Sequence, residues 1–260
     1  MKDFERFMHL IVRKAGVIAL ANFQLEQKIG WKKGKSIVTA TDIKINKFLV
    51  SEIKKNFSGH NIISEELPDI KNKHTYTWFI DPIDGTINYA QGIPYFGVSV
   101  GLARGKEIIM GMVFDPVHKE LFFAEKGRGS FLNGRKFVST ARNNFSESMI
   151  SVEIWNNSKY PILKMKQALE KRIWVLSERQ CLCVSACYSA LGRMDGYIFS
   201  HDTPWDVAAI DLICREAGLK TSQMDGQPWY PGGKMKGYVC ARPKVHKELI
   251  GLLKPYIKKI

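Results

Sequence analysis

The segment Trp78–Thr86 (WFIDPIDGT) places two acids three residues apart, directly after an apolar run. Pro82 and Gly85 force a tight turn that carries both carboxylates, and the chain is expected to enter a helix after Thr86. Two acids on a rigid turn can bracket Mg²⁺, which binds oxygen ligands and is typically shared with substrate phosphate. The backbone N–H groups of Gly85 and Thr86 suit a phosphate oxygen. A structural Asp turn is the alternative.

Further acids follow or precede apolar elements in the same manner. Glu65 and Glu66 come directly after the apolar stretch Ile62-Ile-Ser, where an exposed strand end is the alternative explanation. Asp206 begins the apolar segment Trp205-Asp-Val-Ala-Ala, with Thr203 as the predicted N-cap and Pro204 as the first helical residue. Asp42 closes Val38-Thr-Ala-Thr-Asp. An acid in the first turn of a helix is common because it favours the helix dipole, and this alternative applies to Asp42 and Asp206.

The elements that must position these acids follow from hydrophobic periodicity. Helical spacing predicts helices over 3–28 and 41–56, the second capped by Thr39 or Thr41. Short apolar runs at 61–64 and 77–80 predict strands, and residues 95–125 alternate strand-like runs with glycine turns, which is typical of antiparallel hairpins. Beyond about residue 145 helices and strands alternate. The predicted helices are 161–171, 181–193, 205–217 and 244–257, and the predicted strands are 173–176, 195–199 and 236–241.

This change of texture predicts an α+β half over residues 1–145 and an α/β half over 146–260. The Glu-Glu and DPIDGT motifs belong to the first half and Pro204-Trp-Asp to the second, so we expect intimately packed halves with the site between them.

Composition excludes several classes of protein. The chain has 260 residues and a formal charge of +14, and no apolar run approaches the 18 residues of a membrane span. No uninterrupted apolar stretch of a secretory signal is present near the N-terminus, so a cytoplasmic location is expected. Basic residues are scattered apart from 28–35 and 254–259, and no nucleic-acid motif accompanies them, so nucleic-acid binding is not expected.

Five cysteines form no CxxC pair, and their odd number favours reduced thiols. Three of them, Cys181, Cys183 and Cys187, are expected to pack in the core on a buried helix, because their spacing fits no usual zinc finger.

Taken in order, Glu65-Glu66, DPIDGT at 81–86 and PWDVAA at 204–209 resemble the inositol monophosphatase family. The segments Val38–Asp42, Gly127–Gly134 and Leu191–Asp195 resemble further motifs of that family, so the resemblance covers almost the whole chain. It implies a layered αβαβα sandwich of the sugar-phosphatase type. It also implies a Mg²⁺-dependent, lithium-sensitive phosphomonoesterase that acts on a small phosphorylated metabolite and forms a homodimer.

The resemblance also implies roles for individual residues. Glu65, Asp81 and the carbonyl of Ile83 would hold one Mg²⁺, while Asp81, Asp84 and Asp206 would hold a second. A third, more weakly bound ion would be coordinated by Glu65 and waters, and Glu66 would orient the ligands without binding an ion itself. Asp42 and Thr86 would orient the attacking water, so the catalytic set is Glu65, Asp42 and Thr86. The substrate would contact Asp84, Gly85, Thr86 and Asp206.

The sequence departs from the family pattern where the leaving group is expected to bind. Inositol-hydrolysing relatives carry an acid at the position of Phe199, and small residues where this chain has Gln180-Cys-Leu-Cys183. Asp202 could substitute for the missing acid, but an exposed loop acid is the favoured interpretation. Arg179 and Arg193 could meet a second phosphate, although Arg193 is expected to cap its helix.

Inositol-1-phosphate is therefore the first substrate hypothesis. The alternatives within the family are fructose-1,6-bisphosphate, a nucleotide such as 3′-phosphoadenosine 5′-phosphate or NADP, and histidinol phosphate. A basic protein that binds RNA or a partner, and an inactive member of the family, are the remaining hypotheses. The predicted site gathers six of the 25 Asp and Glu residues in a chain with 39 Lys and Arg, which suits Mg²⁺ first and a small phosphorylated anion second.

Overall fold

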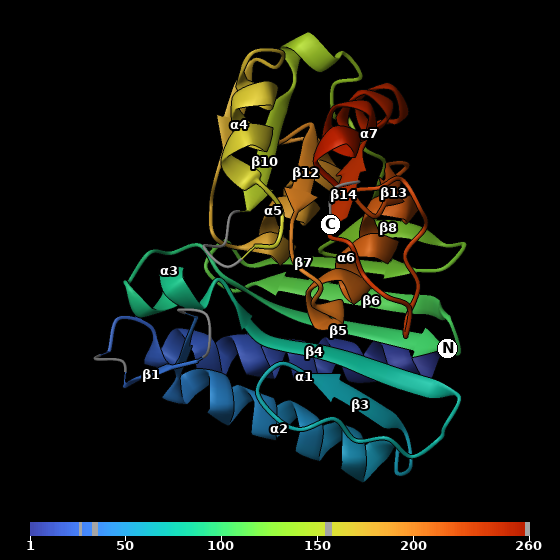
Figure 1. Ribbon diagram of the computed structural model, residues 1–260. Coiled ribbons are helices and arrows are strands. Elements are labelled where there is room, and N and C mark those ends of the chain that lie inside the picture. The colour runs from blue at the N-terminus through green and yellow to red at the C-terminus, as the bar shows by residue number, and fades with distance from the viewer. Residues whose placement is uncertain (26–27, 33–35, 154–157, 258–260) are drawn as a thin grey trace.

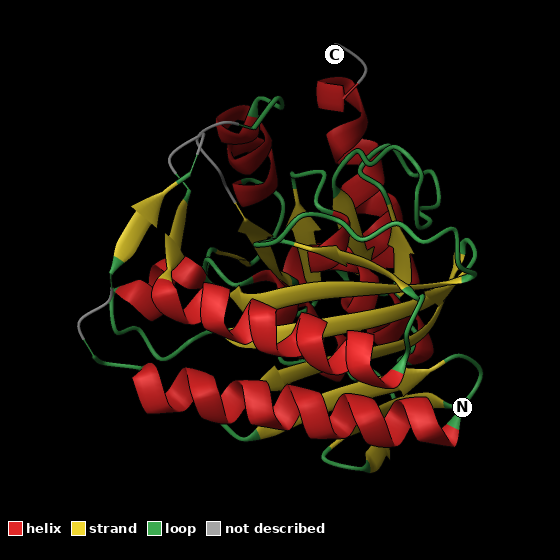
Figure 2. Ribbon diagram, turned by 90° about the horizontal axis from the view of Figure 1, so that it is seen from below, coloured by secondary structure: helices red, strands yellow, loops and turns green. Residues whose placement is uncertain are grey.

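The computed structural model describes residues 1–25, 28–32, 36–153 and 158–257. Helices and sheets alternate in five layers (Figure 1). Helices α1 (Lys2–Asn22) and α2 (Ala40–Asn56) lie side by side over one face of a seven-stranded sheet (Figure 2). Helices α5 (Leu182–Leu191) and α6 (Pro204–Glu216) separate this sheet from a five-stranded one, whose far face is covered by α4 (Ile162–Glu170) and α7 (Pro243–Ile257). The predicted αβαβα sandwich is confirmed.

The seven-stranded sheet has the order β3-β4-β5-β6-β7-β8-β9. Only β3 and β4 run parallel within it, and the remaining neighbours are antiparallel, as the glycine turns between 95 and 125 predict. The strands are β3 (Asn61–Ser64), β4 (Tyr76–Asp84), β5 (Gly97–Arg104), β6 (Glu107–Asp115), β7 (Glu120–Glu125), β8 (Gly129–Leu132) and β9 (Arg135–Phe137).

The five-stranded sheet has the order β11-β10-β12-β14-β13, with β10 parallel to both of its neighbours. Its strands are β10 (Met149–Glu153), β11 (Val175–Ser177), β12 (Gly196–Phe199), β13 (Lys220–Ser222) and β14 (Tyr238–Ala241). The sequence did not predict β13, which has three residues and no clear alternation. Three short elements remain: the hairpin β1 (Ile29–Trp31) and β2 (Ile37–Thr39), the helix α3 (Thr86–Ala90) and a 3₁₀ turn at Phe145–Glu147.

Alternation along β4 explains how one strand serves two cores. Trp78 and Ile80 point toward α1 and α2, whereas Phe79 points toward α5 and α6, because successive side chains of a strand face opposite sides of the sheet. All three side chains are almost completely buried. A third apolar cluster lies between the five-stranded sheet and helices α4 and α7. The acids at the end of β4 therefore sit on a strand fixed from both sides. The tight turn predicted at Pro82 is wrong, because β4 continues to Asp84 and accommodates Pro82 where its pairing with β5 shifts register between Asp81 and Asp84.

Two predicted helix boundaries are wrong. The helix predicted over 3–28 ends at Asn22, because Phe23 turns to extended backbone and packs its ring against Tyr89 and Phe96. The helix predicted over 181–193 ends at Leu191, and Gly192 takes the left-handed conformation that terminates it. The helices predicted over 41–56, 161–171, 205–217 and 244–257 differ from the observed ones by one residue at one or both ends.

The division at residue 145 stays a prediction of domain organisation. Helices α5 and α6 belong to the C-terminal half of the chain, yet they share one apolar cluster with strands of the N-terminal sheet. Among the described residues, no helix is both long and apolar enough to cross a membrane.

Candidate active site

Four predicted metal-binding acids meet at one cavity of about 200 Å³, which Glu65, Asp81, Asp84 and Asp206 line together. Glu65 follows β3, and its amide donates to the carbonyl of Ile80 at 3.2 Å, which fixes it beside Asp81. Because β3 and β4 run parallel, their carboxyl ends reach the same edge of the sheet. The first turn of α6 brings Asp206 to this edge from the opposite layer.

Small residues allow α6 to come close enough. Gly101 and Gly111 are paired across β5 and β6, and α6 lies on them through Ala208 and Ala209. A Cβ at Gly111 would lie 2.4 Å from the carbonyl oxygen of Ala209, so any larger residue would push the helix away. Thr203 is the N-cap and Pro204 begins α6, as predicted. The two alanines after Asp206 thus serve the approach of α6 to the sheet.

Asp81 has the environment of a cation ligand. Its carboxylate is buried, and Oδ1 makes no hydrogen bond with any described residue. Burial and the carboxylates of Glu65, Asp84 and Asp206 raise the pKa of Asp81 well above its usual value. A buried group of this kind is costly unless a partner neutralises it. The donors around it are oxygen atoms, so the site fits a hard cation such as Mg²⁺.

Asp84 caps helix α5 from a distance of about a hundred residues in sequence. The backbone amide of Cys183 donates a hydrogen bond to Asp84 Oδ2, and the thiol of Cys181 lies 3.3 Å from the same oxygen. Burial raises the pKa of Asp84, while these hydrogen bonds oppose the rise. The N-terminus of α5 also favours the ionised carboxylate of Asp84, so it acts with the hydrogen bonds and against burial.

The cysteines are all free and buried, as predicted. Core packing is nevertheless an incomplete account of Cys181, which also lines the cavity and contacts Asp84. One ligand atom each from Asp84, Cys181 and Cys183 lies within 4.8 Å of the others. Burial raises the pKa of both thiols, so they are neutral neighbours of the acids at physiological pH.

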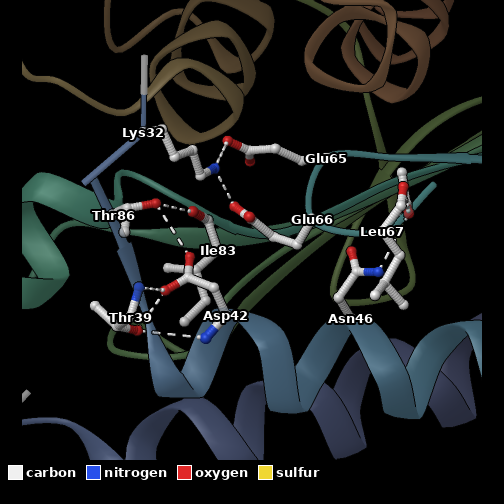
Figure 3. A network of polar contacts seen from close by, with 10 residues as sticks. Lys32, Thr39, Asp42, Asn46, Glu65, Glu66, Leu67, Ile83 and Thr86 are labelled. Carbon is white, nitrogen blue, oxygen red and sulfur yellow. Dashed lines mark hydrogen bonds and ion pairs between the residues drawn. The ribbon is translucent and has the colours of Figure 1, made fainter. Parts of the chain in front are cut away.

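The predicted water-orienting pair is in hydrogen-bond contact (Figure 3). Thr86 Oγ1 lies 3.1 Å from Asp42 Oδ1 and 2.9 Å from the carbonyl oxygen of Ile83. Thr39, rather than Thr41, is the N-cap of α2 and forms a capping box with Asp42, which holds that carboxylate in place. Burial raises the pKa of Asp42 to about 6, against the hydrogen bonds from Thr39 and Thr86.

Lys32 is a site residue that sequence reasoning missed. Its Nζ lies between Glu65, at 2.9 Å from Oε1, and Glu66 (Figure 3). Burial alone would lower the pKa of Lys32, yet the two carboxylates raise it to about 12. Burial and the charge of Glu65 raise the pKa of Glu66 to about 7. The only signal in the sequence is the basic stretch 28–35, part of which lies outside the described residues.

Gly85 requires both its conformation and its size. Its φ of +86° is left-handed, and an added Cβ would lie 3.1 Å from Cys181 Cβ and from the carbonyl oxygen of Tyr95. Asn88 donates from Nδ2 to the carbonyl oxygens of Tyr95 and Arg179, both at 2.8 Å. These contacts hold residues 179–180, just before α5, against the DPIDGT segment. The two segments therefore lie side by side in the lining of the cavity.

Two of the positions at which the chain departs from the family pattern line the cavity, as expected. They are Phe199 and the segment Gln180–Leu182. Asp202 is exposed and pairs with Lys159, which agrees with an ordinary loop acid.

The two arginines do not contact the cavity. The backbone amide of Arg193 donates to the carbonyl oxygen of Tyr188 at 2.9 Å and so caps the C-terminus of α5, as predicted. Its side chain pairs with Glu120 and lies over the ring of Tyr188. Arg179 lies over the ring of Tyr95, with its guanidinium carbon 5.6 Å from the centroid.

Glu153 is the second site residue that the sequence did not single out. It ends β10, is 2% exposed and lines the same cavity as the metal-site acids. Glu65 is recognisable because it follows a predicted strand. The sequence predicts no strand over 149–153, so this signal is missing for Glu153.

The layered fold and the acidic cavity together define the class of metal-dependent phosphomonoesterases. The model of the Inositol monophosphatase family matches residues 2–258, so the chain belongs to the inositol monophosphatase family. Inositol monophosphatase 1 of Homo sapiens is 30% identical over 229 residues, covering 84% of this chain and 83% of that protein.

Both a curated protein and a solved structure from Thermotoga maritima are also similar to the chain. The curated protein is described as fructose-1,6-bisphosphatase/inositol-1-monophosphatase and is 28% identical over 251 residues, covering 96% of this chain and 95% of that protein. The solved structure, an inositol monophosphatase, superposes with a TM-score of 0.89 and 27% identity over 99% of each chain. The protein is thus a phosphoric monoester hydrolase of a Mg²⁺-dependent family.

Proposed function

We propose that this protein hydrolyses inositol-1-phosphate, or a closely similar polyol monophosphate, to the free alcohol and inorganic phosphate. One observation carries the proposal: the predicted acids Glu65, Asp81, Asp84 and Asp206 converge on a single cavity that is also lined by Thr86, whose hydroxyl donates to Asp42. Phosphate monoester hydrolysis is among the slowest uncatalysed reactions, so a concentrated electrostatic site is what the chemistry demands.

The residues that would hold two or three Mg²⁺ ions are Glu65, Asp81, the carbonyl of Ile83, Asp84 and Asp206. When bound, Mg²⁺ supplies positive charge that neutralises the phosphoryl oxygens and the leaving alkoxide, and it lowers the pKa of water. The buried Oδ1 of Asp81, which has no partner among the described residues, supports this assignment.

Thr86 and Asp42 orient the attacking water. The Thr86 hydroxyl has one proton, which it can direct to Asp42 Oδ1 or to the carbonyl of Ile83. Its lone pairs then accept a hydrogen bond from a water and turn that water's oxygen toward the phosphorus. The backbone N–H groups of Gly85 and Thr86 are proposed donors to a phosphoryl oxygen. No side chain has to act as the nucleophile.

The cavity lining favours a monophosphate over a bisphosphate substrate. Among the described residues that line it, none is Lys or Arg. Among these described residues, a second phosphate of fructose-1,6-bisphosphate, 3′-phosphoadenosine 5′-phosphate or NADP would therefore meet acids and uncharged groups. Paired phosphate recognition relies on arginine or lysine.

A phosphate-release screen tests the proposal. Purified protein is assayed with inositol-1-phosphate, fructose-1,6-bisphosphate, adenosine 3′,5′-bisphosphate, NADP and histidinol phosphate, with Mg²⁺ and with EDTA. We expect Mg²⁺-dependent turnover that is highest for inositol-1-phosphate. Failure on every ester would reject the proposed activity, and a salt-titrated RNA-binding assay would then test the alternative of a basic binding protein.

Two further properties are proposed from the family. Lithium should inhibit turnover, which a Li⁺ titration in the same assay measures. The chain should form a homodimer, and light scattering with size-exclusion chromatography should return twice the 29.6 kDa of one chain.

A further inference from the structure

Glu153 is a buried carboxylate for which the proposed hydrolytic step has no use. Its side chain is 2% exposed, and neither Oε1 nor Oε2 makes a hydrogen bond with the described part of the chain. Burial, together with the charges of Asp84 and Glu178, raises the pKa of Glu153 to about 8. The nearby backbone amides of Cys181 and Gln180 do not reach hydrogen-bond geometry with the carboxylate and oppose this rise only in part. Such a group costs stability, so its retention calls for a reason.

The position of Glu153 supplies one. β10 and β12 are parallel neighbours, and Glu153 is directly in register with Phe199. Residues in register on adjacent strands project to the same face of a sheet. Both residues line the cavity that the metal-site acids line. Glu153 therefore adds a carboxylate to the cavity beside the apolar ring of Phe199, on the sheet that does not carry Asp81 and Asp84.

A purely structural role does not fit these contacts. A structural buried acid is normally paired with a base or accepts several hydrogen bonds. The charged groups that raise the pKa of Glu153 are the acids Asp84 and Glu178, and no described Lys or Arg lines the cavity. The partner that satisfies Glu153 is therefore expected to enter with the substrate.

Glu153 and Phe199 together favour one class of leaving group. Carboxylate oxygens accept hydrogen bonds from alcohol hydroxyls, and the ring of Phe199 packs against carbon-bound hydrogens of a sugar or polyol. A second phosphate would place like charge against Glu153, and a wholly apolar leaving group would leave it unpaired, as the free protein does.

We propose that Glu153 is a specificity-determining residue whose carboxylate accepts a hydrogen bond from a hydroxyl of the leaving alcohol, so that polyhydroxylated monophosphates are preferred. This inference rests on the proposed phosphomonoesterase function. It assigns a substrate contact to β10, an element that contributes none of the substrate-contacting positions expected from the sequence.

Steady-state kinetics with matched substrates test it. Wild type, E153Q, E153A and the control E248Q are assayed with inositol-1-phosphate, glycerol 2-phosphate and phenyl phosphate, all at saturating Mg²⁺. Glu248 is a suitable control because it is exposed, pairs with Arg172 at 3.1 Å and does not line the cavity. E153A should lower kcat/KM for the two hydroxylated esters by roughly 10- to 100-fold. The loss should lie mainly in KM, E153Q should be intermediate, and phenyl phosphate should change less than about threefold.

Unfolding measurements separate substrate contact from a structural role. E153Q should unfold at the same or a higher temperature than wild type, because it removes an unpaired buried acid. Equal losses of kcat/KM on all three esters, or wild-type values on all three, would overturn the inference. A wild-type preference for phenyl phosphate over both hydroxylated esters would overturn it as well.

The same assay distinguishes failure of the inference from failure of the proposed function. Mg²⁺-dependent turnover of phenyl phosphate that is indifferent to Glu153, with no selective loss on the hydroxylated esters, retains the phosphatase and refutes the specificity role. Absence of turnover on every ester by wild type refutes both.

Discussion

Replacing Gly111 by alanine should damage the active site from a position that holds no catalytic group. The added Cβ would lie 2.4 Å from the carbonyl oxygen of Ala209 and 2.9 Å from its Cα, whereas ordinary contact begins at 3.4 Å. Backbone cannot rotate away as a side chain does, so α6 must retreat from β6 by about 1 Å. Asp206 lies in the first turn of this helix and would move with it.

The magnitude follows from two general effects. Overpacking a closely packed core costs about 1–3 kcal/mol of stability. A displacement of about 1 Å in a group that positions the reaction costs on the order of 100-fold in rate. Gly111→Ala is therefore expected to lower the unfolding free energy by about 2 kcal/mol, lower kcat/KM on the order of 100-fold and raise the Mg²⁺ concentration needed for half-maximal activity.

Gly251→Ala is the matched control. Gly251 lies inside α7, and an added Cβ there would meet nothing within 4 Å. Alanine in a helix interior is better than glycine by about 0.5–1 kcal/mol, so this variant should gain stability and keep wild-type kinetics.

Urea unfolding and Mg²⁺-titrated phosphate release measure both effects. Wild-type stability and wild-type kcat/KM in Gly111→Ala would refute the argument that close packing of α6 positions Asp206. A loss of stability with unchanged kinetics would refute the link to the site while leaving the packing argument intact.

Three further predictions concern charged groups. Asp81→Asn should lower Mg²⁺-dependent turnover on the order of 1000-fold without lowering the unfolding temperature, because the lost carboxylate oxygen has no described partner; wild-type turnover would contradict the metal assignment. Lys32→Met should lower the Mg²⁺ concentration for half-maximal activity by up to about fivefold, since it frees Glu65 from an ion pair worth at most ~1 kcal/mol, and an unchanged or raised midpoint would count against this competition. Burial lowers the pKa of His246 to about 4 from 6.5, so the neutral imidazole stabilises the fold fully above pH 6.5 and this stabilisation is lost as pH falls toward 4. In wild type the free energy of unfolding should therefore fall by about 2 kcal/mol over that range after partial solvent screening, and His246→Asn should not show this fall. The same pH dependence of unfolding in both proteins would disprove the assignment.

The local motifs were predictable because their physics is local. Gly85 separates β4 from α3 with a φ of +86°, a conformation that few other residues adopt. Pro82 by contrast does not make a turn, because β4 continues through it to Asp84 with a register shift. Thr203 and Pro204 define the start of α6 by cap and backbone preference, which involve neighbouring residues only. The acids in these motifs could therefore be named from the sequence, together with the family they resemble.

Long, strongly periodic elements were also predictable, and their failures have identifiable causes. Helix α2 begins and ends within one residue of prediction because its apolar spacing and its Thr39–Asp42 capping box agree. Helix α1 was predicted too long because Phe23 leaves the helix to pack on Tyr89 and Phe96, residues more than sixty positions away. Tertiary packing overrides helical spacing there.

Tertiary structure alone decided which side chains share the cavity. Lys32 contacts Glu65 and Glu66 across separations of 33 and 34 residues in sequence, and no spacing in the sequence indicates that contact. Glu153 and Phe199 become neighbours because β10 pairs in parallel with β12, a register that depends on an entire sheet. The sequence by itself determined the acidic motifs to which metal binding is proposed, because those motifs are short and local. The packing of layers determined the proposed substrate end of the site, because that end is built from strands whose pairing is long-range.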